Sequence, residues 1–144
     1  MTQMTCARQR LAAAIDLPAV LDAAYEAFED MLAVLRRHQE DDESTFPAFV
    51  LAAAAAANGR DWIAGADTLP EGSPQDRAGD GLEDSDVADV DIARAVAALS
   101  GELAARLTSA VAAGIGSAGD RECCERAASE AAAITALLGG VNPP

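Results

Sequence analysis

The sequence contains few aromatic residues and no lysine. Aromatic side chains make up 3% of the chain, with one tryptophan and one tyrosine, and β-branched residues are also scarce. Because strands are enriched in these two classes of residue, no β-sheet is expected. Alanine, the strongest helix former, is instead the most frequent residue, and apolar residues recur at intervals of three and four. The sequence therefore predicts an all-α fold.

Histidine is nearly absent, since His38 is the only one. Di-iron sites in helical bundles take a histidine from each of two helices, so one histidine excludes them. A Ser-His-Asp triad is also unsupported, because no serine lies in a strained turn that would pair with His38. The position of His38, after two arginines near the expected end of a helix, favours a cation interacting with the helix dipole over a metal ligand.

Cysteine is scarce as well, with Cys6, Cys123 and Cys124. An odd number without the spacing of a disulfide framework indicates a reducing cytoplasm. Neighbouring residues on a helix point about 100° apart. We therefore interpret Cys123 and Cys124 as small buried apolar residues and not as a redox pair.

Positively charged residues are scarce as well. Ten basic residues against 24 acidic ones give a formal net charge of −14. This charge repels phosphate backbones and anionic membrane surfaces, so neither nucleic acid nor a membrane is expected as a partner. The longest uncharged apolar run, residues 46–57, is too short to cross a bilayer.

Four segments carry an apolar stripe of helical period. Asp16 is expected to cap the first, and Pro47 lies in the first turn of the second. Asn58-Gly59 predicts the end of the second, with Trp62 and Ile63 following either in a short extra turn or in a continuation of the helix. The fourth is expected to begin at Ser117 or Asp120. The predicted helices cover about residues 17–40, 46–58, 87–113 and 120–138.

Residues 65–86 differ in composition from the rest, because proline, glycine and acidic residues replace the apolar stripe. Such a segment is typical of a flexible loop. Two short links and one long one predict an antiparallel four-helix bundle with a long acidic loop between its second and third helices. We expect residues 1–144 to form a single helical domain.

Six consecutive alanines, residues 52–57, raise the question of what such a smooth helix packs against. A row of small residues on the third predicted helix, which includes Gly101, would allow a close crossing of the second and third helices. The alternative is that the alanines only promote helix formation and partly face solvent.

Acidic residues Asp22, Glu26, Glu29 and Asp30 share one face of the first predicted helix. Glu26, Glu29 and Asp30 would be candidate ligands of a magnesium ion if an acid from another helix joined them. This arrangement would suit a hydrolase of nucleotide-like phosphate esters. The competing interpretation, which the sequence favours, is a solvated face opposite the apolar stripe.

The sequence favours a non-enzymatic interaction or regulatory protein that needs no cofactor. Tyr25, Leu32, Val111 and Ile115 form second apolar edges that would be partly exposed on an isolated bundle. A homodimer or a partner protein would cover them. A third alternative is a bundle that encloses a small apolar ligand, with Trp62 as one wall of the pocket.

Overall fold

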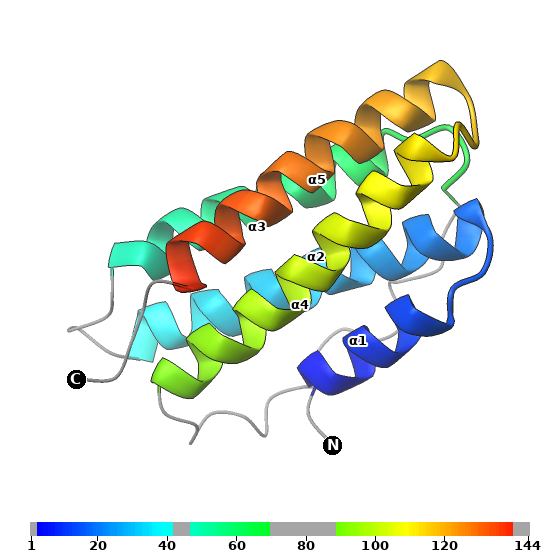
Figure 1. Cartoon of the computed structure of the whole chain (residues 1–144). Helices are drawn as coiled ribbons and strands as arrows, with labels where there is room; N and C mark the ends of the chain where they lie inside the picture. The colour runs from blue at the N-terminus through cyan, green and yellow to red at the C-terminus, as the bar shows by residue number, and fades with distance from the viewer. Residues whose placement is uncertain (1–2, 42–46, 70–88, 140–144) are drawn as a thin grey trace.

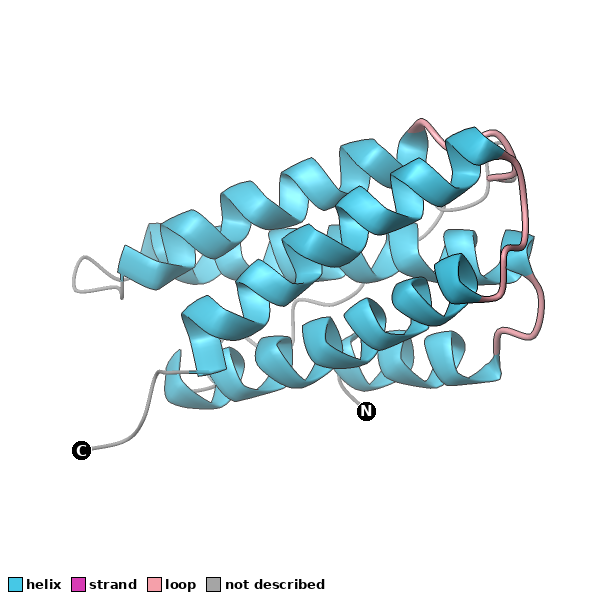
Figure 2. Ribbon diagram, turned by 45° about the horizontal axis from the view of Figure 1, so that its top comes forward, coloured by secondary structure: helices cyan, strands magenta, loops and turns pink. Residues whose placement is uncertain are grey.

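The structure is a computed structural model that describes residues 3–41, 47–69 and 89–139, which form five helices and no strand (Figures 1 and 2). The all-α fold class is confirmed for these residues, with one helix more than expected. Most of the predicted acidic loop lies outside the described ranges, and the single domain stays a prediction. The helices are α1 Gln3–Ala13, α2 Leu17–Asp41, α3 Pro47–Ala64, α4 Asp89–Ala112 and α5 Ala118–Gly139.

Helix α1 is the element that sequence reasoning missed. Its buried residues Ala7 and Leu11, with Ala14 just beyond its end, are spaced four and three apart, and α1 packs against α2 and α4. A helix this short is marginal by itself, so its stability comes from this packing. The spacing of the three residues was the available signal, but it covers only two turns.

Helix α2 lies against three others: α1, α3 and α4. It begins as predicted, because Asp16 Oδ1 accepts a hydrogen bond of 2.9 Å from the amide of Ala19. Since neighbours surround most of α2, the expected exposure of Leu32 is wrong: its side chain is 3% exposed. Tyr25 is partly buried against the same core.

Helix α3 passes through the predicted stop at Gly59 and continues to Ala64. Gly59 is buried beneath the ring of Phe28, and a Cβ at residue 59 would lie 2.8 Å from Phe28 Cδ1. A glycine can end a helix, but here its missing side chain makes room for an aromatic ring of the neighbouring helix.

The alanines of α3 face α2 and α5, the two helices against which α3 packs closely. Ala52, Ala53, Ala55 and Ala56 are buried, whereas Ala54 is exposed. The expected crossing of this helix with α4 is wrong, because the closely packed neighbours of α4 are α1, α2 and α5. The Cβ position of Gly101 on α4 faces Thr135 of α5, 3.9 Å from its Oγ1.

Three connecting segments meet at one end of the structure (Figure 2): the α1–α2 link, residues 65–69 after α3, and the α4–α5 turn. Gly114 and Gly116 in the last of these have positive φ angles, of 69° and 90°. L-amino acids with side chains rarely adopt such angles, so glycine permits this turn. Leu17 lies close to Gly116, which brings the start of α2 to the same place.

Candidate functional site

The acidic face of α2 is paired with arginines from α1 and α3. Glu26 is 5% exposed and lies 3.3 Å from Arg10 Nε of α1, and Asp30 Oδ2 lies 3.4 Å from Arg10 Nη2. The interpretation of this face as solvated is therefore wrong at Glu26. This burial could not be inferred from the sequence, because the helix that covers Glu26 was not predicted.

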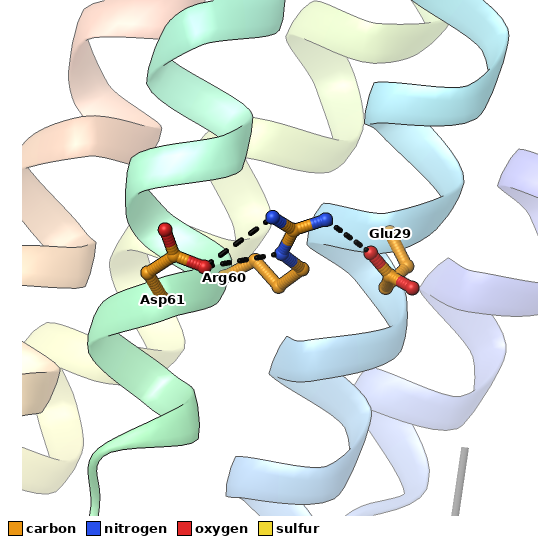
Figure 3. A network of polar contacts seen from close by, with 3 residues as sticks. All are labelled: Glu29, Arg60 and Asp61. Atoms are coloured by element: carbon orange, nitrogen blue, oxygen red, sulfur yellow. Dashed lines mark hydrogen bonds and ion pairs between the residues drawn. The ribbon is translucent and has the colours of Figure 1, made fainter. Parts of the chain in front are cut away.

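Glu29 belongs to a second polar group, with Arg60 and Asp61 of α3 (Figure 3). Arg60 Nη1 donates to Glu29 Oε2 at 2.9 Å, and Arg60 Nε and Nη2 both lie 3.3 Å from Asp61 Oδ1. The hydrogen bond with Glu29 raises the pKa of Arg60, which burial alone would lower. This ion pair ties the second half of α3 to α2.

The two arginines bear on the magnesium alternative. Arg10 holds Glu26 and Asp30, and Arg60 holds Glu29, so a metal ion at these carboxylates would have to displace both guanidinium groups. Across residues 3–41, 47–69 and 89–139, no group of three or more His, Cys, Asp or Glu side chains is placed to hold a metal ion. The geometry of the described residues therefore gives the metal alternative no support.

Asp120 is the centre of a polar junction that the sequence did not indicate. It is 1% exposed, and its Oδ1 accepts a hydrogen bond of 3.0 Å from the amide of Thr68, beyond the end of α3. Its Oδ2 accepts hydrogen bonds from the hydroxyl of Thr68 and from the amide of Ser117. Ser117 Oγ in turn accepts from the amide of Asp120 at 3.0 Å, so the two residues form a capping box at the start of α5.

The electrostatics of this junction favour an ionised Asp120. Burial raises the pKa of its carboxyl group, but the hydrogen bonds from Thr68 and Ser117 outweigh burial and lower it. The Asp120 carboxylate accepts three hydrogen bonds, two of them from Thr68. It therefore fastens residues 67–69 to α5. Its role in the described structure is to hold elements together.

Cys123 and Cys124 follow this junction on α5, and both side chains are buried, as expected of small apolar residues. Burial raises the pKa of Cys124 to about 11 and also raises that of Cys123. Thiols with raised pKa values are poor nucleophiles. His38 lies within α2, but its side chain is outside what the structure describes.

Trp62 lies at the surface of α3, not inside the bundle. Its side chain is 37% exposed, and the guanidinium carbon of Arg126 on α5 lies 5.5 Å from the centre of its ring. This is a cation–π contact between neighbouring helices. One pocket of the described structure lies between α1 and α4 and is lined by other residues.

The outward face of α3 is apolar and exposed. Val50 is 48% exposed and Leu51 is 56% exposed, and Ala54 lies between them and Trp62 along the same face. No charged residue occurs in α3 before Arg60. We refer to Val50, Leu51, Ala54 and Trp62 as the α3 surface. At the end of the structure where the connecting segments meet, Ile15 and Ile115 are also exposed, at 92% and 49%.

Residues Asp91–Ala112 of α4 are long and apolar enough to cross a membrane, by length and composition alone. In the structure the leucines of this helix, Leu99, Leu103 and Leu107, are fully buried in the core. A core helix of this composition has the same properties, so the segment is weak evidence for a membrane span.

Comparison with known proteins does not add a function. No protein-family model matches the chain, and no curated protein or solved structure is significantly similar to it. Any functional assignment therefore depends on the surfaces described above.

Proposed function

We propose that this protein is a non-enzymatic interaction protein that binds a second copy of itself through the α3 surface. The observation that carries the proposal is the exposure of two adjacent large apolar residues, Val50 and Leu51, on an uncharged stretch of helix. Large apolar side chains grouped on one exposed face are typical of contact surfaces.

The charge of the chain favours this surface over others. Two molecules with a net charge of −14 each repel one another, and the repulsion is weakest where the facing surfaces are uncharged. In a twofold dimer the same patch meets itself, so the uncharged part of the α3 surface, Val50, Leu51 and Ala54, is self-compatible. Ala54, at the middle of the α3 surface, would let the two helices approach closely.

We also propose that α2, α3, α5 and α4 form an antiparallel four-helix unit. The close packing of α2 with α3, of α3 with α5, of α5 with α4 and of α4 with α2 supports this arrangement. Helix α1 then lies on the outside of this unit, against α2 and α4. The free state of the three cysteines supports the cytoplasm as its location, and no cofactor is invoked.

Sedimentation equilibrium of the full chain across the micromolar range tests the proposal. The wild type is expected to dimerise, and the double variant Val50→Glu/Leu51→Glu to be monomeric, because two added charges per chain would face each other across the contact. The matched control is Ala132→Glu/Ala133→Glu, which adds the same charge at two adjacent exposed residues of α5. A monomeric wild type, or equal weakening by both double variants, would overturn the proposal.

A further inference from the structure

A cavity of about 260 Å³ lies between α1 and α4, away from the α3 surface. Its apolar wall is formed by Leu11, Ala12 and Ala105, and Ser109 adds a hydroxyl group. Of the α4 residues that line it, Ala105 and Ser109 have small side chains, which leaves space beside Leu11. Most of its lining residues are exposed, so it is a pocket open to solvent, with room for a small molecule that has an apolar body.

The polar groups at the cavity carry an excess of positive charge. They are the guanidinium groups of Arg8 and Arg106 and the carboxylate of Glu102, which leaves one net positive charge. The chain as a whole has a net charge of −14, so this is an unusual place on the molecule. It would attract a small anion that the rest of the surface repels.

Arg8 is paired with a carboxylate that the carboxylate of a ligand could replace. Its Nε lies 2.6 Å from Glu102 Oε2 and its Nη2 lies 3.1 Å from Glu102 Oε1, a bidentate pairing of guanidinium and carboxylate. Both side chains are about half exposed, at 49% and 48%. An exposed pair of this kind contributes little to stability, so a second carboxylate can compete for Arg8.

The guanidinium group of Arg106 is held in place by one hydrogen bond, but another of its donors has no acceptor. Its Nη2 donates to the backbone carbonyl of Ala14, which fixes the guanidinium between α1 and α4. Its Nε is buried and has no hydrogen-bond partner within the described structure. A buried donor without an acceptor is unfavourable, and an acceptor brought by a ligand would relieve this if the guanidinium turned toward the cavity.

We propose that this cavity binds a small carboxylic acid with an apolar body, such as a short-chain fatty acid. The carboxylate pairs with Arg106 and with Arg8, in competition with Glu102, and the hydrocarbon part packs against Leu11 and Ala105. The carboxylate fits because an arginine presents two parallel donors to it. The hydrocarbon part fits because Leu11, Ala12 and Ala105 provide an apolar wall.

Isothermal titration of the full chain with hexanoate is the first test, and hexanamide is the uncharged comparison. Hexanoate is expected to bind at one site per chain, and hexanamide at least about tenfold more weakly, because a hydrogen bond to a charged group is lost. Amide chemical shifts of Leu11, Ala105 and Ser109 should move on titration. Absence of hexanoate binding, or equal affinity for both compounds, would overturn the proposal.

Three variants make the test specific. Arg106→Gln should weaken hexanoate binding about tenfold or more. Glu102→Gln should strengthen it, because the competing carboxylate is removed; a residue with only a structural role would not produce a gain. Ala105→Leu, at an exposed residue of the wall, should abolish binding by filling the cavity while leaving the fold intact.

The matched controls are Arg94→Gln on the same helix and Ala133→Leu on α5, both at exposed residues outside the cavity. Neither should change the affinity for hexanoate. Unchanged affinity in Ala105→Leu, or weaker binding in Glu102→Gln, would contradict the assignment. Because the cavity is separate from the α3 surface, dimerisation should be the same in all five variants.

Discussion

The ring of Phe28 on α2 lies against the backbone of Gly59 on α3, in the space that a side chain at residue 59 would occupy. Phe28 is fully buried, and a Cβ on residue 59 would overlap its ring. This contact sets how closely α2 and α3 approach. It also explains why a residue that weakens helices lies inside one.

Gly59→Ala is expected to destabilise the protein by about 1–3 kcal/mol, because a methyl group forced into a packed core displaces the Phe28 ring. Gly101→Ala is the matched control within α4, since its Cβ would have only an ordinary contact with Thr135. That change should raise stability by up to about 1 kcal/mol through helix propensity. Urea denaturation measures both. Equal effects of the two substitutions would contradict the packing explanation.

Arg10→Met is expected to cost about 2 kcal/mol of unfolding free energy, because it removes the cation beside the buried carboxylate of Glu26. Arg8→Met is the control on the same helix, and it should change stability little, since Arg8 and Glu102 are half exposed. Thermal denaturation of both variants provides the measurement. If Arg8→Met proved the more damaging, the role assigned to Arg10 would be wrong.

Stability should fall in acid in part through Asp120. Its pKa in the folded chain is lower than the ordinary value of 3.8, so the ionised carboxylate stabilises the fold above pH 3.8. This contribution is lost as the pH falls through the lowered pKa. Asp120→Asn should therefore cost about 1–3 kcal/mol near neutral pH, and the difference from wild type should shrink below pH 3.8. Urea denaturation over a pH series measures this.

The exposed residue Glu122 on α5 provides the control for that series. The stability of Glu122→Gln should follow that of the wild type at each pH. A constant difference between Asp120→Asn and wild type across the acid range would show that the ionisation of Asp120 does not contribute.

Magnesium is not expected to raise the melting temperature, because Arg10 and Arg60 already pair with the three carboxylates that would bind it. The measurement is differential scanning calorimetry with magnesium chloride and with sodium chloride at equal ionic strength. A rise specific to magnesium, and lost in Glu26→Gln, would instead support the phosphohydrolase alternative.

Thiol labelling should distinguish the three cysteines. Cys6 is partly exposed and should react with a disulfide reagent in the folded protein at about pH 8. Cys123 and Cys124 are buried, and the pKa of Cys124 is about 11, so both should react only after unfolding. In Cys6→Ser the fast reaction should disappear. Rapid labelling that remains in this variant would show that α5 opens readily.

The sequence by itself determined the helical character of the chain and most helix starts. Apolar spacing predicted four of the five helices that the described residues form, and local signals such as Asp16 and Ser117 acted as caps in the structure. These features involve residues only a few positions apart. Such interactions can be predicted from the local sequence, because the backbone geometry of a helix brings those positions together.

Only the tertiary structure decided the rest. Glu26 looks like a solvated acid along α2 and becomes buried only because α1, a helix too short to be evident alone, packs over it. Gly59 resembles a helix stop until Phe28 is placed against it, and Asp120 resembles a cap until Thr68 reaches it from another segment. In each case the deciding partner is distant in sequence. Its position depends on which helices pack together, and a periodic pattern on one helix does not specify its neighbours.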